Sequence, residues 1–554
     1  MLQSTEVDGV PVFWAPGDGV LRASLWFRAG MVDESLPTRG WLHLIEHLAL
    51  HGRDSVRVPV NGHVSLLYSS FDVEGEPEDV VAFLRDVCRW LAEPDFKDLE
   101  HERRVLRAES ETRGGGGLTG GHLLWRYGAR GAGLGGYDEL GLYTAEPDGL
   151  RALAGWAYAQ GNAVLALSGP PPAGLELPLQ PGPRVLPAPA RPCDQPTPAG
   201  FVGRQNTIAL SGTIARTTAA TTMLRALQRD LQRGLRHGAG VGYSAWSSYE
   251  PVDADHAMLT AGMDVLAEAV PTVVDQSTAV LRRLRDRGPD PTELRDDLNQ
   301  QIRQYASHPI NEWLPFLAAR DVLTGRPVTT SADELVAETE AVTVADVRQA
   351  AHGLWRDLLV SVDRAGAGSP QLTWLDGPPA AGKQPSGQRF RPVGSPVAKG
   401  ELTVGRTEIH RQAEDAAISA QYDDLAAMVA YPDGGRLLIR QDGYQVTVEP
   451  TMWQKGQQAV ALLDSAVARP LRVQLPERAP EEIPKSSVRT RDKVQYWGNR
   501  PIVWAPFLVL CLLGVVLALA TEEIAAQASK FVVMGAIVGL VSYVKHRRDG
   551  GSPT

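Results

Sequence analysis

Residues 43–47 read His-Leu-Ile-Glu-His, and this H-x-x-E-H spacing constrains the chain more than any other feature. In a helix, residues four apart lie on one face, so His43 and His47 stack one turn apart with Glu46 on the same side. Two such imidazoles can bind one Zn²⁺, and the carboxylate can accept a proton from a water on the metal. We therefore expect a helix here that carries part of a zinc site, with Glu46 as general base.

A catalytic zinc site needs a third protein ligand as well as a position for water. Residues 100–109 contain no Gly or Pro and are rich in helix formers, which predicts a second helix. Glu102 and Glu109 are seven residues apart and share a face that also carries Leu99 and Leu106, so this face is expected to point inward. An inward carboxylate needs a partner, and a metal is a natural one. The alternative is a solvated face of a charged helix.

On these residues the chain resembles the pitrilysin/insulinase family of zinc peptidases. In that family the helix after the H-x-x-E-H helix carries two glutamates seven apart; the second binds zinc and the first supports the site. The resemblance implies that Zn²⁺ is held by His43, His47 and Glu109, with Glu102 as the supporting carboxylate. The stretch between His47 and Glu109 is shorter than usual for the family. Because these ligands fill the protein positions of the metal, no ligand role is expected for His51, His63, His101 or His122.

The resemblance extends to residues that would meet the substrate. Residues 7–30 resemble the opening strands of the family, and residues 60–73 resemble the edge strand to which a substrate adds, with Asn61 beside it. Arg236 and Tyr243 have the spacing of an arginine and a tyrosine that reach the substrate from the second domain of active members. Such a pair can stabilise the oxyanion of peptide hydrolysis. The plain alternatives are a surface arginine with a core tyrosine, and a turn at Asn61.

The expected fold class is α/β (α+β), with two homologous sheet-plus-helix halves over about residues 1–365. The complete family enzyme is a clamshell of four such units, so a closed chamber would need a second chain, as a homodimer or a heterodimer. Pro- and Gly-rich stretches separate the parts. The expected boundaries are a zinc-binding domain at 1–168, a linker at 169–200, a second peptidase-like domain at 201–368, a linker at 369–400, a β-rich domain resembling a pleckstrin-homology domain at 401–468, and a basic linker at 469–500.

The last part of the chain has the pattern of a membrane hairpin. Residues 501–520 contain no charged residue and are long enough to cross a bilayer. Residues 524–544 are a second apolar run, for which an interfacial helix is the alternative. Lys and Arg residues flank both runs and the connection between them is acidic, so the positive-inside rule places both ends in the cytoplasm. No signal peptide pattern begins the chain, so we expect the bulk of the protein on the cytoplasmic side of the cell membrane.

Composition narrows the possible partners. The net charge of −10 argues against a nucleic acid. The β-rich region 399–468 has six Lys or Arg residues against ten Asp or Glu residues, which disfavours anionic lipid head groups. The sequence predicts a membrane-anchored zinc metallopeptidase that hydrolyses peptides or unfolded polypeptides. The alternatives are a non-catalytic scaffold and a vestigial peptidase-like partner protein at the membrane.

Overall fold

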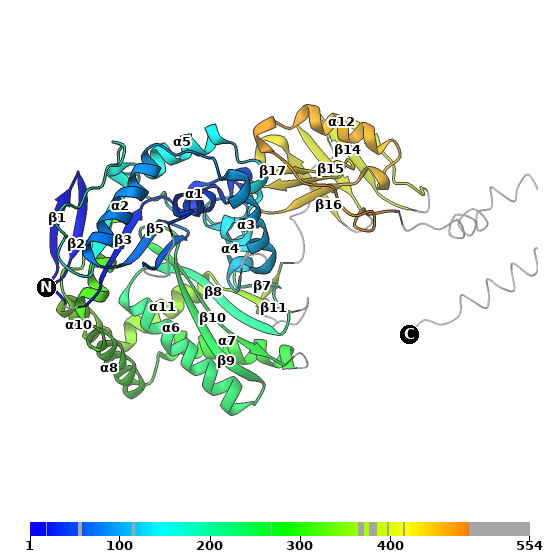
Figure 1. The fold of residues 1–554 in the computed structure, drawn as a ribbon. Coiled ribbons are helices and arrows are strands. Elements are labelled where there is room, and N and C mark those ends of the chain that lie inside the picture. The colour runs from blue at the N-terminus through cyan, green and yellow to red at the C-terminus, as the bar shows by residue number, and fades with distance from the viewer. Residues whose placement is uncertain are drawn as a thin grey trace, which may run out of the picture.

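The computed structural model describes residues 1–486, except residues 18, 54–57, 114–116, 267–268, 364–370, 376–384, 396–397 and 414–415. The described chain forms two α/β domains, each with one six-stranded sheet, and a C-terminal domain with two four-stranded sheets (Figure 1). The mixed α/β class with several sheets is the one expected from the sequence.

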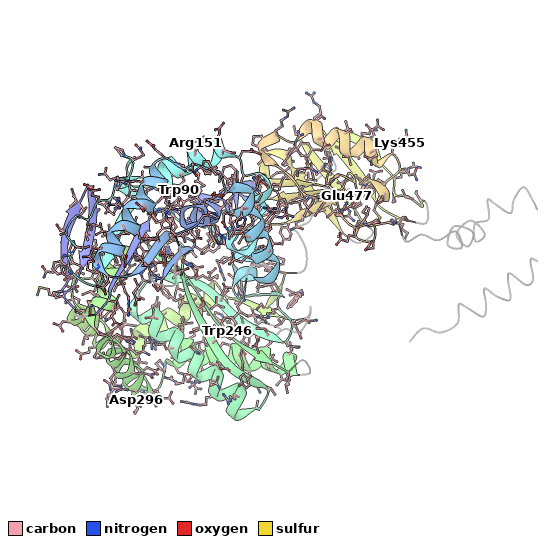
Figure 2. All side chains as sticks on the ribbon, in the orientation of Figure 1. Trp90, Arg151, Trp246, Asp296, Lys455 and Glu477 are labelled. Atoms are coloured by element: carbon pink, nitrogen blue, oxygen red, sulfur yellow. The ribbon has the colours of Figure 1, made fainter. Side chains whose placement is uncertain are left out.

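The first domain is a sheet in the order β1-β2-β6-β3-β5-β4, covered by helices. Its central strand β6 is buried at every position, as an interior strand requires. Helix α2 buries apolar side chains three or four positions apart, and Trp90 of this helix packs against the same core (Figure 2). Its elements are β1 (Gln3–Val7), β2 (Val10–Trp14), β3 (Leu21–Phe27), α1 (Trp41–Leu50), β4 (Val60–Val64), β5 (Ser69–Gly75), α2 (Pro77–Ala92), α3 (Leu99–Arg113), α4 (Gly120–Tyr127), α5 (Pro147–Ala157) and β6 (Ala163–Leu167).

The second domain repeats this plan. Its sheet has the order β12-β7-β11-β8-β10-β9, in which β7 and β11 are parallel as β2 and β6 are, and β8, β10 and β9 are antiparallel as β3, β5 and β4 are. Its elements are β7 (Ala199–Val202), β8 (Thr207–Ala215), α6 (Thr218–Leu231), the π-helix η6 (Gln232–Gly238), β9 (Gly242–Pro251), β10 (His256–Val265), α7 (Val270–Arg287), α8 (Pro291–Ser307), α9 (Leu314–Thr324), α10 (Ala332–Glu340), α11 (Val344–Arg356), β11 (Leu359–Val362) and β12 (Thr373–Trp374).

Each of the two α/β domains docks one helix on the other domain. Helix α4 of the first domain docks on the second sheet, where buried Arg126 pairs with Asp357 at 2.5 Å and the hydroxyls of Tyr127 and Thr213 are 2.8 Å apart. Helix α9 of the second domain packs on the first sheet, with Ala319 and Leu323 against strand β6. The reciprocal docking joins the two domains through buried surface on both sides.

The C-terminal domain contains strands and the α-helix α12. This helix is not the terminal element that the sequence predicts, because strand β20 follows it and pairs with β17. Strands β12 and β13 lie inside the expected linker 369–400, and β20 lies beyond residue 468. Each belongs to a domain sheet, since β12 pairs with β7, β13 with β14 and β20 with β17. The likeness to a pleckstrin-homology domain stays a prediction. Its elements are β13 (Gly387–Phe390), β14 (Glu401–Gly405), β15 (Glu408–Gln412), β16 (Ala417–Gln421), β17 (Leu425–Ala430), β18 (Arg436–Arg440), β19 (Gln445–Val448), α12 (Gly456–Ala466) and β20 (Arg472–Gln474).

The C-terminal domain packs directly on the first domain. Leu36 and Leu134 of the first domain share a buried apolar cluster with Ala427 and Ile439 of strands β17 and β18. The amide of Ala129 also donates a hydrogen bond to the carbonyl of Gln441, at 2.9 Å. This domain is therefore part of the same packed body as the α/β domains (Figure 1).

The predicted membrane segments, residues 501–520 and 524–544, lie outside the described residues. Among the residues that are described, no helix combines the length and the apolar character needed to cross a bilayer.

Candidate metal centre

Helix α1 is held at its N-terminus by a buried carboxylate. Glu34 accepts hydrogen bonds from the backbone amides of Gly40 and Leu42, at 3.1 and 2.9 Å, so two helix-terminal donors are satisfied. Gly40 has φ +99°, a left-handed conformation that favours glycine. Arg39 lies between Glu34 and Glu139, with Nη1 3.4 and 3.3 Å from their carboxylate oxygens. These contacts determine where the helix begins and therefore which way its histidines face.

His43 and His47 lie one turn apart on α1, and Glu109 of α3 joins them. The three side chains each offer one ligand atom, and these atoms all lie within 4.8 Å of one another. The two imidazole rings are 4.9 Å apart between centroids, and His47 Nε2 is 3.7 Å from Glu109 Oε2. Leu99 and Leu106 of α3 are buried, as expected for the inward face. The structure thus brings together the three residues that the sequence selects as ligands.

A carboxylate orients each imidazole from behind. His43 Nδ1 is 2.9 Å from Glu139 Oε1, and His47 Nδ1 is 3.1 Å from Glu102 Oε2. With Nδ1 engaged in this way, each ring presents Nε2 to the metal position, as metal-bound histidines do. Glu102 therefore lies behind His47, the position that the family resemblance implies for it.

The same carboxylates set the protonation of the histidines. Burial lowers the pKa of His43, but the hydrogen bond and negative charge of Glu139, with the charges of Glu46 and Glu109, outweigh it and leave the pKa raised. For His47, burial and the neighbouring His43 lower the pKa despite the partner Glu102. In the metal-free protein, the proton is therefore held more strongly on His43 than on His47.

Glu46 lies under the edge strand of the first sheet. Its side chain is almost fully buried, and its Oε2 is 3.6 Å from His43 Nε2. Gly62 of strand β4 passes directly over it: a Cβ at Gly62 would lie 2.5 Å from both Cγ and Cδ of Glu46. β4 pairs only with β5 in the described sheet, and Asn61 on it is exposed. A strand edge is therefore open beside the general-base candidate.

Comparison with solved structures identifies the fold of this arrangement. An inactive domain of peptidase M16 from Pseudomonas fluorescens aligns with TM-score 0.56 and 16% identity, over 67% of this chain and 100% of that chain. A protease from Helicobacter pylori aligns with TM-score 0.55 and 14% identity, over 66% of this chain and 99% of that one. The fold is that of peptidase M16. Pitrilysin aligns at TM-score 0.50 and 14% identity, over 65% of this chain but 44% of its own.

At this level of identity the comparison establishes the M16 fold alone. No family model matches the chain, and no curated protein does. The geometry of the site therefore rests on the residues of this chain, which place the imidazole pair, the two glutamates of α3 and the covered Glu46 within one M16-like domain.

Arg236 and Tyr243 lie in the other M16-like domain, on η6 and at the start of β9. The Arg236 guanidinium stands over the Tyr243 ring at 5.6 Å, and the Tyr243 side chain is 77% exposed. The structure thus brings this pair together, and Tyr243 is not the core residue that the alternative reading required. The pair belongs to the second domain, whereas the histidine–glutamate group lies on α1 and α3 of the first (Figure 1).

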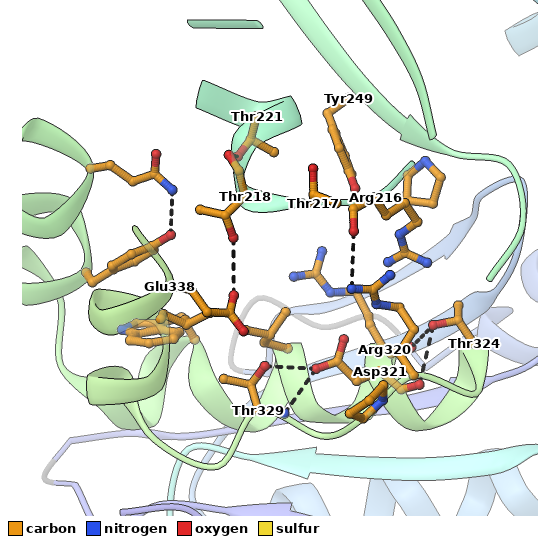
Figure 3. Close-up of a pocket in the computed structure, with 18 of the residues that line it drawn as sticks. Arg216, Thr217, Thr218, Thr221, Tyr249, Arg320, Asp321, Thr324, Thr329 and Glu338 are labelled. Atoms are coloured by element: carbon orange, nitrogen blue, oxygen red, sulfur yellow. Dashed lines mark hydrogen bonds between the residues drawn. The ribbon is translucent and has the colours of Figure 1, made fainter. Parts of the chain in front are cut away.

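A cavity of about 1150 Å³ opens between the two M16-like domains. His63, Ser65 and Tyr68 of the β4–β5 hairpin line one side, and Tyr249 of β9 lines another. Figure 3 shows the polar wall contributed by the second domain, where Thr218 donates to Glu338 and Thr329 donates to Asp321. The cavity therefore begins at the residue after Gly62 on the open strand edge.

Sequence reasoning missed several residues of the site. Glu139 comes from a Gly-rich segment 96 residues from His43 and carries no recognisable pattern. Gly62 and Glu34 were not identified because their roles depend on packing. His51 Nδ1 is 2.6 Å from Glu102 Oε1, and its position four residues after His47 is a signal that could have been read.

The donor set fits a zinc ion. Catalytic zinc sites with three protein ligands use imidazoles and carboxylates. Here two imidazoles have carboxylates behind them, and a third carboxylate faces His47 Nε2. His43, His47 and Glu109 would hold the ion and leave a position for water.

Proposed function

We propose that this protein is a zinc metallopeptidase that hydrolyses peptides or unfolded polypeptides. The observation that carries the proposal is the convergence of His43, His47 and Glu109 beside a buried Glu46, under an open strand edge. Each of these features alone could serve the fold without any catalytic role. Together they provide metal ligands, a general base and a place for an extended substrate.

The residues divide the reaction among them. Zn²⁺ at the site would supply a Lewis acid that makes the attacking water more acidic. The Glu46 carboxylate accepts the proton of that water and donates it to the leaving amine. Glu139 and Glu102 keep the two imidazoles oriented. Arg236 and Tyr243 are proposed to stabilise the developing oxyanion, which requires the η6–β9 turn to meet the substrate.

An extended segment is the substrate form that suits the strand edge. A peptide added to β4 would pair with its backbone near Asn61, and its continuation past His63 would enter the cavity between the domains. Folded proteins present few free strands, so peptides and unfolded chains are favoured.

A second peptidase-like chain is proposed to complete the chamber. The fold of this chain corresponds to 44% of pitrilysin, so a structure of that size needs roughly two such chains. A homodimer and a heterodimer both satisfy this. Residues 501–520 and 524–544 are proposed to anchor the protein in the cell membrane with its bulk in the cytoplasm, which would confine two chains to one plane.

The test uses the full-length protein in detergent, a diverse quenched peptide pool and Glu46→Gln. We expect cleavage that a chelator abolishes and zinc restores, and a fall of about 10²–10⁴-fold in Glu46→Gln with bound zinc unchanged. Glu93→Gln, at an exposed glutamate outside the site, is the matched control and should cleave like the wild type. Equal cleavage by wild type and Glu46→Gln would exclude the proposed mechanism.

A non-catalytic scaffold is the second candidate, and one observation favours it: a solved structure to which this chain is similar is described as an inactive domain. A zinc-loaded wild type that cleaves nothing at any protein concentration would support this candidate. The proteins that co-purify with it would then be the next measurement.

A further inference from the structure

A second cluster of metal-ligating side chains adjoins the first. His51, His101 and Glu102 each offer a ligand atom, and these atoms all lie within 4.8 Å of one another. Glu102 Oε1 is 2.6 Å from His51 Nδ1 and 3.9 Å from His101 Nε2. Asp98 stands at the rim, with Oδ2 3.7 Å from His51 Nε2. The cluster is distinct from the His43–His47–Glu109 group but touches it through Glu102.

Local geometry explains how the cluster forms. His51 follows His47 by four residues and caps the C-terminal end of α1. Asp98 directly precedes α3, and His101 and Glu102 lie in its first turn. The His51 and His101 rings meet edge to face, 5.5 Å apart between centroids. The end of one helix and the start of another therefore bring two imidazoles and the Glu102 carboxylate to one point.

The spacing is close to that of a bound ion. In a tetrahedral zinc site with bonds of about 2.0–2.1 Å, ligand atoms lie about 3.3 Å apart. The 3.9 Å contact between Glu102 Oε1 and His101 Nε2 is slightly wider than this, and the 2.6 Å contact between Glu102 Oε1 and His51 Nδ1 is a hydrogen bond. A cation that replaces the proton between His51 Nδ1 and Glu102 Oε1 would widen this short contact and shorten the contact between Glu102 Oε1 and His101 Nε2.

Exposure of the ligands differs in a way that suits an exchangeable ion. The Glu102 side chain is 8% exposed, whereas those of His51, His101 and Asp98 are 37%, 57% and 48% exposed. The buried carboxylate provides a fixed anchor, and the outer side chains leave the ion open to water. An ion can therefore enter from solvent without moving the α1–α3 core.

We propose that His51, His101 and Glu102 bind a second divalent cation of the zinc class, with Asp98 beside the other ring nitrogen of His51. Glu102 bridges the two sites, since its other oxygen holds His47 Nδ1 at 3.1 Å. A dication on Glu102 repels the dication that His47 holds, so the second ion binds more weakly and lowers the affinity of the first. The protein would thereby respond to free zinc in excess of what the first site needs. This inference goes beyond the proposed peptidase function and does not depend on it.

The test is zinc stoichiometry of the metal-free full-length protein, measured by equilibrium dialysis against increasing free zinc and elemental analysis. We expect the wild type to bind two equivalents, the second more weakly. A His51→Ala/His101→Ala double variant should bind one equivalent. At high zinc, the first site of this variant should have a higher affinity than the first site of the wild type, whose second site is then filled. His352→Ala, which removes an exposed imidazole from α11, should bind two.

His101→Ala alone guards against misfolding, since this side chain is mostly exposed. It should weaken the second equivalent at least about tenfold and leave the first unchanged at low zinc. A wild type that saturates at one equivalent overturns the proposal, as does a double variant that still binds two. Because only bound metal is measured, failure here is separate from failure of the Glu46→Gln experiment.

Discussion

Gly62→Ala is expected to slow catalysis about 10²-fold while leaving the metal in place. The added Cβ would lie 2.5 Å from Cγ and Cδ of Glu46, where carbon atoms need about 3.5–4.0 Å. The Glu46 carboxyl must therefore move by roughly 1 Å, and a misplacement of this size costs on the order of 10²-fold in rate. That corresponds to about 2.7 kcal/mol of transition-state stabilisation. Gly62 does not have a left-handed backbone, so alanine adds no backbone strain.

The measurement is kcat with a peptide found in the quenched pool, together with zinc content and the thermal midpoint. Gly75→Ala, on the neighbouring strand β5, is the matched control, because the nearest atom to its Cβ would be Asp79 Cβ of α2, at an ordinary 3.5 Å. We expect Gly62→Ala to lose about 10²-fold in kcat with zinc content unchanged, and Gly75→Ala to keep wild-type kcat. A Gly62→Ala variant with wild-type kcat would refute the role assigned to Glu46 and to the strand that covers it.

Three further predictions concern the support of the site. Glu139→Gln should weaken zinc binding about 10–100-fold in competition with a chelator, whereas Glu93→Gln should not; equal affinities would mean that Glu139 does not orient His43. Because the pKa of His43 is raised above 6.5, the metal-free protein gains stability that is fully present below pH 6.5 and is lost as the pH rises through the raised pKa. The free energy of unfolding of the metal-free protein, measured by chemical denaturation, should therefore fall with rising pH. Glu139→Gln should make this fall smaller, and an unchanged fall would contradict the assignment. Ile439→Ala should lower stability by about 2–5 kcal/mol and also weaken zinc binding, because Ile439 packs on the segments next to Glu139. Leu463→Ala, inside the C-terminal core, should lower stability without changing zinc affinity, and equal effects of the two on zinc would disprove the supporting role of the C-terminal domain.

The site shows how far local patterns reach. The helices at residues 43–47 and 100–109, and the inward direction of Leu99 and Leu106, follow from a 3.6-residue period that any stretch of chain carries within itself. Glu109 as the partner of both histidines required the family resemblance, because nothing local relates two helices more than fifty residues apart. The structure brings the three side chains together, so that expectation agrees with the geometry.

The sequence by itself determined the chemistry that the first domain carries: two imidazoles and a carboxylate on one face of α1, and two carboxylates on one face of α3. Tertiary structure alone decided what surrounds them. Glu139 behind His43, Gly62 over Glu46 and the packing of the C-terminal domain beside Glu139 all join residues far apart in the chain. The physical reason is that helical periodicity is a property of neighbouring residues, whereas these contacts exist only after sheets and domains have packed against one another.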